Sequence, residues 1–301
     1  MKKRLFIGIL VFCMLCSTAC KYISPETPST APSAASSETP SQESTATSST
    51  SPTTVPEPTA DYSHVPFTPV YSSEDYFESK EYYCDSIKET LYYLFHEPLR
   101  DIDEPLPLVI FFHGKGDTVT ESQLGTAGPI VKSLMALENQ DFRYSTYTLV
   151  PSSPLSHEGG WTIYQILAFR IVLWDVLNRY NIDKDRIYVS GISMGGFMTC
   201  QLVSEMPDTF AAAVPLSGAG TLMSPEKAGG TAFRIYHYTD DPVVSVTRSR
   251  DLYQQLVKAK HPNVELIEYP TGSHISPIYT VFQSDRDAFF SWLFSQRLSN
   301  P

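Results

Sequence analysis

The sequence lacks the patterns that mark metal, nucleotide and nucleic-acid chemistry. It contains no His-Glu-x-x-His zinc pattern and no phosphate-binding loop, and residues 114–125 carry glycines without the Gly-x-Gly-x-x-Gly fingerprint of dinucleotide sites. The formal net charge is −11, so nucleic acid is not an expected partner. We therefore expect a chain that uses no metal and no cofactor.

The longest apolar run lies at the N-terminus. Residues 2–4 are basic, residues 5–15 are apolar, and small residues then lead to Ala19-Cys20. This order is typical of an export signal, and the apolar run is too short to span a membrane comfortably. The stretch ending in Ala19-Cys20 resembles the lipobox of bacterial lipoproteins, in which the cysteine is lipidated and becomes the new N-terminus. Ser17 stands where the lipobox usually has leucine, so cleavage without lipidation is the alternative.

Residues 23–60 have almost no large apolar side chains. They are Ser, Thr, Pro and Ala with four glutamates and Gln42, and Ile23 and Val55 are the large aliphatic residues among them. Such a segment buries too little apolar surface to offset the entropy of ordering. We predict a signal peptide over residues 1–19, a disordered tether over 20–65 behind a lipidated Cys20, and a folded domain over 66–301, held away from the membrane surface.

Cysteine is scarce in the predicted domain. Of five cysteines, Cys13 and Cys16 belong to the signal and Cys20 is the anchor, which leaves Cys84 and Cys200 without the spacing of a metal site. We expect two buried thiols, with a disulfide as the alternative that an exported chain permits.

Apolar runs of strand length alternate with helical patterns along the domain. This alternation predicts a mainly parallel sheet with helices on both faces, which binds ligands at the carboxyl ends of its strands. The expected strands are 82–85, 91–95, 106–112, 147–150, 187–189, 211–216, 233–237 and 264–269, and the expected helices are 130–137, 161–180, 194–205, 245–260 and 278–296.

The stretch RIYVSGISMGGF, residues 186–197, runs from a strand pattern through closely spaced glycines into a helix pattern. Glycine lets the backbone turn where a Cβ would clash, so Gly-x-Ser-x-Gly between strand and helix can hold Ser193 on a sharp turn with its hydroxyl exposed. An ordinary turn that happens to contain serine gives the same pattern. The residues that could activate Ser193 must distinguish between these two interpretations.

A serine hydroxyl needs a base within hydrogen-bond reach and an acid that orients the base. His274 is the best base, because it follows the last predicted strand on a glycine-containing loop, in YPTGSH, that can reach the same sheet edge. For the acid, HYTDDPVV places Asp240 and Asp241 just after the strand 233–237. The other candidates for the base fit less well: His64, His96 and His261 are expected at the surface, and His157 precedes the serine.

The stretches FFHGKGD, DKDRIYVSGISMGGF, PDTFAAAVPLSG, YHYTDDPVV and EYPTGSH together look like the esterase branch of the α/β-hydrolases, which includes proteins similar to dienelactone hydrolases, polyhydroxybutyrate depolymerases and feruloyl esterases. The likeness covers about residues 80–298. It implies an α/β-hydrolase fold and a Ser-Asp-His triad. By the family's spacing the acid is Asp241, and His237 is structural. Tyr238 replaces the family's usual glycine, so Asp240 stays open as the alternative.

The same resemblance implies an oxyanion hole. His113-Gly114 matches the turn that supplies one backbone N–H, from Lys115, and the second comes from Met194. Trp161 lies at the ligand edge of the sheet, where it could stack on a sugar or phenolic ring or pack in the core.

These features favour an exported serine esterase at the cell surface. The sequence does not fix its acyl group or alcohol, and acetylated or feruloylated plant polysaccharide is the substrate that the resemblance and the location suggest. The membrane is a partner through the lipid anchor only. A serine aminopeptidase is one alternative, and a tethered binding module without activity is another.

Overall fold

The computed structural model describes residues 60–153, 161–220, 222 and 225–298. The described residues belong to one compact unit, Thr50–Pro301. The expected signal, Cys20 and most of the tether lie outside the described residues, as does His157, so their assignments stay predictions. In the part of the chain that is described, no helix has the length and hydropathy needed to cross a membrane.

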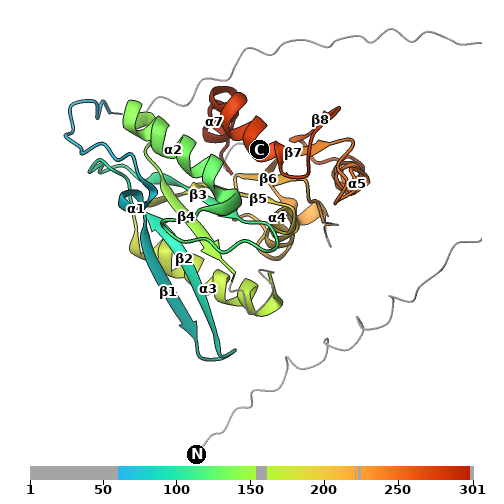
Figure 1. Cartoon of the computed structure of the whole chain (residues 1–301), viewed down its shortest axis with the longest axis horizontal. Coiled ribbons are helices and arrows are strands. Elements are labelled where there is room, and N and C mark those ends of the chain that lie inside the picture. The colour runs from blue at the N-terminus through green and yellow to red at the C-terminus, as the bar shows by residue number, and fades with distance from the viewer. Residues whose placement is uncertain (1–59, 154–160, 221, 223–224, 299–301) are drawn as a thin grey trace, which may run out of the picture. The chain divides into compact units, whose positions relative to one another are not determined.

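An eight-stranded sheet forms the centre of this unit, in the order β1-β2-β4-β3-β5-β6-β7-β8 (Figure 1). β1 and β2 form an antiparallel hairpin, β2 pairs antiparallel with β4, and the strands from β4 to β8 run parallel. The prediction of a mainly parallel sheet is therefore confirmed. The strands are β1 (Glu78–Cys84), β2 (Glu89–His96), β3 (Leu106–Phe112), β4 (Tyr147–Ser152), β5 (Ile182–Ile192), β6 (Ala212–Leu216), β7 (Ala232–Tyr238) and β8 (Val264–Tyr269).

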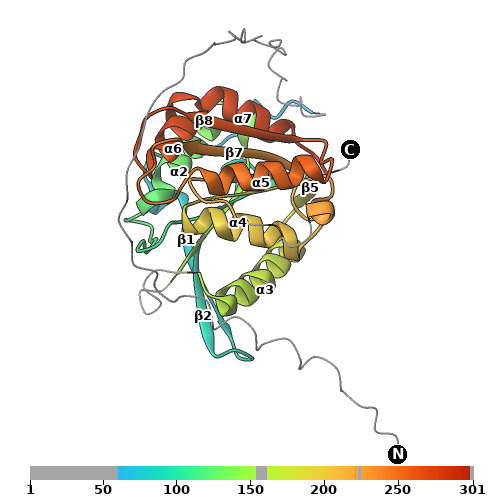
Figure 2. The same ribbon diagram turned by 90° about the vertical axis from the view of Figure 1, so that its right-hand side faces the viewer.

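Helices cover both faces of the sheet, as expected (Figure 2). One face carries α3 (Ile163–Arg179), α4 (Met194–Glu205) and α5 (Thr247–Lys258). The other carries α2 (Gly128–Gln140) and α7 (Arg286–Ser295), with the short helices α1 (Ser73–Tyr76) and α6 (Ser276–Tyr279). We refer to these as the α3 face and the α2 face.

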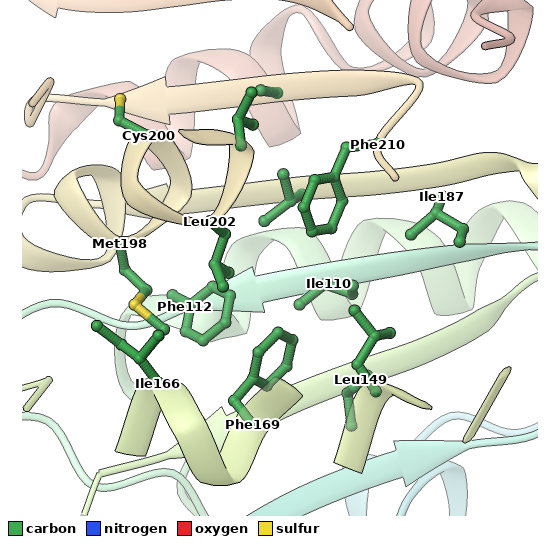
Figure 3. Close-up of a cluster of buried hydrophobic side chains, with 14 of the residues drawn as sticks. Ile110, Phe112, Leu149, Ile166, Phe169, Ile187, Met198, Cys200, Leu202 and Phe210 are labelled. Atoms are coloured by element: carbon green, nitrogen blue, oxygen red, sulfur yellow. The ribbon is translucent and has the colours of Figure 1, made fainter. Parts of the chain in front are cut away.

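The core of the α3 face holds the helices against the central strands (Figure 3). Phe112 at the end of β3 meets Phe169 of α3, with 4.8 Å between ring centroids, and Met198 and Leu202 of α4 complete the cluster. Truncating a buried aromatic side chain of this kind to alanine costs about 3–5 kcal/mol of unfolding free energy. Because these contacts fix β3 and α4, they also fix the turns that follow β3 and precede α4.

The predicted helix over 278–296 is interrupted. The chain instead forms α6, a π-helical turn (Thr280–Ser284) and then α7. The N–H of Asp285 donates to the carbonyl of Thr280 at 2.8 Å, which is the wider hydrogen-bond spacing of a π turn. A change of helix type within a segment does not show in the spacing of apolar residues, so the sequence pattern predicts one continuous helix here.

The expectation that His96 lies at the surface is wrong. β2 continues through His96, and its side chain is only 2% exposed. The ring stacks on Tyr76 with 3.6 Å between centroids, and Nε2 lies 2.8 Å from Glu138 Oε2. His261 is half-buried against Phe233, whereas His64 is exposed as expected.

Cys84 and Cys200 are buried free thiols, which confirms the expectation for both. Burial raises the pKa of Cys200 to about 12.

Candidate active site

Ser193 lies between β5 and α4 in a backbone conformation that non-glycine residues rarely adopt, with φ 56° and ψ −116°. Such a conformation costs on the order of 1–3 kcal/mol and needs a surrounding structure that enforces it. The N–H of Ser193 donates to the carbonyl of Leu216 at 2.8 Å, which ties the turn to the end of β6. The sequence folds in this way because Ile187 and Val189 of β5 belong to the same buried core as Met198 and Leu202 of α4.

The neighbouring glycines make room for this turn. A Cβ on Gly195 would overlap the carbonyl oxygen of Phe112, and one on Gly196 would overlap the carbonyl oxygen of Gly218. A Cβ on Gly191 would overlap the backbone of Gly195. These contacts involve backbone atoms that cannot move aside, so the spacing of glycines around Ser193 follows from close approach between β3, β5, α4 and the end of β6.

The backbone next to Ser193 offers hydrogen-bond donors. Met194 is the first residue of α4, and N–H groups in the first turn of a helix have no partner within the helix. The turn after β3 lies beside the serine, because a Cβ added to Gly114 would be 3.7 Å from Ser193 Cβ. The turn that carries Lys115 therefore adjoins Ser193, and the Lys115 side chain is exposed.

Side-chain hydrogen bonds hold the turn after β3. His113 Nδ1 donates to the Gly114 carbonyl at 2.7 Å, and its Nε2 accepts from the N–H of Ser153 at 2.9 Å. Burial lowers the pKa of His113, so the ring is neutral, as this pattern of one donor and one acceptor requires. On the other side, the Gly114 N–H donates to Thr126 Oγ1 at 3.2 Å, and Thr126 Oγ1 donates to Asp117 at 2.6 Å.

Asp241 and His274 come together at the carboxyl ends of β7 and β8. His274 Nδ1 donates to Asp241 Oδ2 at 2.7 Å, and Asp241 Oδ1 accepts from the N–H groups of Val243 and Val244 at 2.8 and 3.1 Å. Burial would raise the pKa of Asp241, but these hydrogen bonds outweigh it and hold the pKa below its usual value. The carboxylate is therefore ionised and oriented at neutral pH.

A second histidine, His237, also contacts Asp241, and the sequence reasoning missed this contact. Its Nε2 lies 2.9 Å from the Val244 carbonyl and 3.3 Å from Asp241 Oδ2, and its Nδ1 is 2.7 Å from Ser249 Oγ. Because a carbonyl can only accept, the proton is on Nε2 and Nδ1 accepts from Ser249. Burial lowers the pKa of His237, so the ring is neutral. The spacing of four residues between His237 and Asp241 was the available signal.

Asp240 points elsewhere. It is exposed, and its Oδ1 accepts from the N–H of Gly272 at 2.9 Å, which holds the loop that leads to His274. Tyr238 stacks on Tyr269 with 5.0 Å between centroids and shares a 2.7 Å hydrogen bond with Thr280. A Cβ on Gly272 would overlap the Tyr238 ring, so a tyrosine at position 238 requires glycine at position 272, in the loop that leads to His274.

Trp161 packs rather than projects. Its Nε1 donates to the His113 carbonyl at 3.0 Å, and its ring meets Phe112 with 5.0 Å between centroids. Of the two interpretations of Trp161, these contacts favour packing, and the side chain supports the turn that carries Lys115.

Ser193 and His274 both lie at the carboxyl edge of the parallel strands, but within the described residues no hydrogen bond joins Ser193 Oγ to His274. Hydrogen bonds between catalytic groups often tighten only when substrate is bound. The described part of the chain also contains no group of three or more His, Cys, Asp or Glu side chains that could hold a metal ion.

Solved structures share this architecture. A thermostable esterase superimposes with a TM-score of 0.65 and 29% sequence identity, over 74% of this chain and 64% of that one. The chain has the α/β-hydrolase fold. The sequence profile of the Prolyl oligopeptidase family matches residues 159–228 of this chain, the part that includes Ser193 and its turn.

Curated relatives match shorter stretches. Acetylxylan esterase A of Emericella nidulans is 38% identical over 66 residues, which is 22% of this chain and 21% of the relative. Poly(3-hydroxyalkanoate) depolymerase C of Paucimonas lemoignei is 35% identical over 54 residues, which is 18% of this chain and 13% of the relative. The matched regions thus span about a fifth or less of the length of these relatives.

Proposed function

We propose that this α/β-hydrolase is a serine carboxylic-ester hydrolase with Ser193 as nucleophile, His274 as general base and Asp241 as the acid that orients it. The observation that carries the proposal is the 2.7 Å Asp241–His274 hydrogen bond at the same sheet edge as a serine with positive φ. The likeness to a thermostable esterase and to an acetylxylan esterase supports the ester-hydrolase class.

The mechanism follows from the tautomer of His274. Since Nδ1 donates to Asp241, the lone pair is on Nε2, which takes the Ser193 proton as Oγ bonds to the ester carbonyl carbon. The carbonyl π electrons move to the oxygen, and the N–H groups of Met194 and Lys115 stabilise the resulting oxyanion. Backbone donors of this kind are worth about 3–4 kcal/mol each. His274 then gives its proton to the departing alcohol, and water repeats the sequence to release the acid.

The test is the Ser193→Ala variant of the full chain. Turnover of a short aryl ester should fall to the background rate while circular dichroism and the melting temperature show an intact fold. A fluorophosphonate probe should label the wild-type chain at Ser193. Undiminished turnover by the variant would contradict the assignment, and failure of labelling in a folded wild-type chain would favour an inactive binding module.

A peptidase is the second candidate, because the Prolyl oligopeptidase profile covers the turn around Ser193. Aryl esters and aminoacyl anilides assayed side by side distinguish the two. We expect kcat/KM to be higher for the esters by at least tenfold, and the reverse ratio would make the chain a peptidase.

We further propose that the substrate is an acetyl or feruloyl ester of polysaccharide and that the protein is an exported lipoprotein anchored through Cys20. The match to acetylxylan esterase A and the basic, apolar and small-residue order of residues 2–20 support these proposals. A panel of acetyl, feruloyl and longer acyl esters tests the first. Replacing Cys20 by serine, with labelling by a palmitate analogue, tests the second: labelling should be lost and the protein should leave the membrane fraction.

A further inference from the structure

A cavity of about 300 Å³ opens on the α2 face of the sheet, between the hairpin β1–β2 and the loop that follows His113. Its lining includes Tyr92, Leu94, Ser152, Thr118 and Thr120. Sites for small molecules commonly measure about 300–1,000 Å³, so this cavity has the size for one small ring or chain segment. Its lining contains none of the three proposed catalytic residues.

The cavity lies along the same sheet edge as Ser193. Tyr92 is opposite Ser152 in the β2–β4 pairing, and β4, β3 and β5 follow in the sheet before Ser193 is reached. Three strand spacings of about 4.8 Å place it roughly 14 Å from the serine. An acetyl group on Ser193 could not reach it, whereas the rest of a polymeric substrate could.

The chemistry of the lining selects a neutral ligand. Lys80 is the charged residue among those that line the cavity, and its ammonium is already engaged by Glu78 at 2.8 Å and by the Tyr180 hydroxyl at 3.3 Å. Thr118 Oγ1 is buried and, among the described residues, has no hydrogen-bond partner. Ser152 Oγ accepts from the N–H of Val119 at 2.9 Å and keeps its own proton to donate.

Of the two tyrosines that line the cavity, Tyr92 and Tyr93, only Tyr92 has an exposed ring. Tyr92 is 48% exposed, although most of the other residues of β2 are buried. A sugar ring has an apolar face that stacks on an aromatic ring and hydroxyl groups that need partners at its edge. A sugar hydroxyl can supply the hydrogen-bond partner that Thr118 Oγ1 lacks, whereas an aliphatic acyl chain cannot, and pairing a buried polar group is worth about 1–3 kcal/mol. The combination therefore fits a sugar better than an acyl chain.

The loop over the cavity is held in place before any ligand arrives. Thr120 and Gln123 exchange two backbone hydrogen bonds of 2.9 and 3.1 Å, and Glu121 accepts from the N–H of Ser79 at 2.8 Å. Preformed sites avoid the cost of ordering on binding. Beyond the cavity, Tyr83 is 55% exposed on the same face of the hairpin, diagonally across from Tyr92, and extends the aromatic surface along β1 and β2.

We propose that this cavity is a sugar-binding subsite, in which Tyr92 stacks on one ring of a neutral oligosaccharide and Thr118 and Ser152 hydrogen-bond to its hydroxyl groups. The inference rests on the proposed esterase function and deepens it, because the subsite would hold the polysaccharide on which the ester is carried.

Binding is measured without turnover, by titrating xylotetraose into the full-length Ser193→Ala variant in a calorimeter. We expect saturable binding that weakens at least tenfold when Tyr92→Ala is added, because stacking on the ring is lost. Tyr92→Phe should keep the affinity within about twofold, and Thr118→Val should weaken it severalfold. Tyr92 is exposed, so its truncation should leave the melting temperature nearly unchanged.

Trp174→Ala is the matched control, since Trp174 is an aromatic side chain on α3 that is 68% exposed and lies on the opposite face. Its removal should leave xylotetraose affinity unchanged. In the active chain, Tyr92→Ala should also lower the ratio of kcat/KM for an acetylated xylo-oligosaccharide to kcat/KM for an aryl acetate.

Three outcomes would overturn the subsite: no binding of xylotetraose, equal affinity in the Tyr92→Ala variant, or loss of affinity in the Trp174→Ala variant instead. Adsorption to poly(3-hydroxybutyrate) particles that depends on Tyr92, without binding of xylotetraose, would replace the sugar by a polyester. If Ser193→Ala retains turnover, the proposed function fails, but the binding measurements still decide the subsite.

Discussion

Replacing Asp241 by asparagine tests the orientation of His274 directly. The two oxygens of Asp241 accept from four groups: the N–H groups of Val243 and Val244 on one side, and His274 and His237 on the other. An asparagine can present only one oxygen. If that oxygen stays on the backbone side, its NH₂ group faces His274 Nδ1, and the imidazole must move its proton to Nε2, the atom that accepts from Ser193 in the proposed mechanism.

The opposite amide orientation is no better. The NH₂ group would then face the backbone N–H groups of Val243 and Val244, and the side chain would lose both hydrogen bonds that hold it in place, worth about 0.5–1.5 kcal/mol each. The protein therefore takes the first orientation and the wrong tautomer. In serine proteases the same exchange lowers kcat about ten-thousandfold, which is about 5.4 kcal/mol at 1.36 kcal/mol per factor of ten. We expect a loss of this order in kcat on an aryl acetate at fixed pH.

Asp240→Asn is the matched control for this variant. Asp240 accepts one hydrogen bond, from the N–H of Gly272, and an amide oxygen can accept it equally well. Turnover should therefore stay within about threefold of wild type, since an exposed substitution of this kind changes little. If the Asp240→Asn variant shows the large loss of turnover, or if the Asp241→Asn variant retains a tenth of wild-type turnover, the assignment of Asp241 is refuted.

Other substitutions probe the strain and packing around the site. Ser193→Gly should be more stable than Ser193→Ala by ~1 kcal/mol in urea denaturation, because glycine tolerates positive φ, and equal stabilities would argue against strain at this turn. Gly272→Ala should lower kcat, because its Cβ meets the Tyr238 ring, and adding Tyr238→Ala should restore part of the loss; additive effects would show that the two residues do not compete for space. The lowered pKa of Asp241 adds stability at pH values above the ordinary aspartate pKa, and this stability is lost as the pH falls through the folded-state value; Asp241→Asn should flatten the acid limb of a melting-temperature profile, and an unchanged limb would exclude this contribution. Cys200 should resist alkylation in the native state, since burial raises its thiol pKa to about 12, and labelling at the rate of a free thiol would contradict its burial.

The parallel part of the fold could be predicted because its strands are continuous apolar runs. β3 reads LPLVIFF and is buried along almost its whole length, as expected for a strand covered on both faces. The hairpin β1–β2 was harder, because the pattern gave two short strands without their pairing. β1 and β2 are longer than predicted, and β2 runs on through His96 into the core.

The error at His96 has a physical cause. A histidine two residues before proline reads as part of a surface turn, because proline ends regular structure. What buries His96 is a partner far along the chain, Glu138 on α2, together with the ring of Tyr76. Contacts between distant segments leave no periodic signal, so local patterns assign such a histidine to the surface.

The loop that carries Asp240 and Asp241 shows the same limit of prediction from local sequence. Spacing alone could not choose between Asp240 and Asp241, because both follow β7 and either could turn toward His274. The structure separates them through their partners: two consecutive backbone N–H groups and His237 surround one carboxylate, and a single loop N–H meets the other. Tyr238, the last residue of β7, made the choice between the two aspartates uncertain, and its ring lies against Gly272 in the loop that leads to His274. A Cβ at position 272 would overlap that ring, so the tyrosine restricts this position to glycine. This restriction arises where two distant segments pack together and cannot be read from either stretch alone.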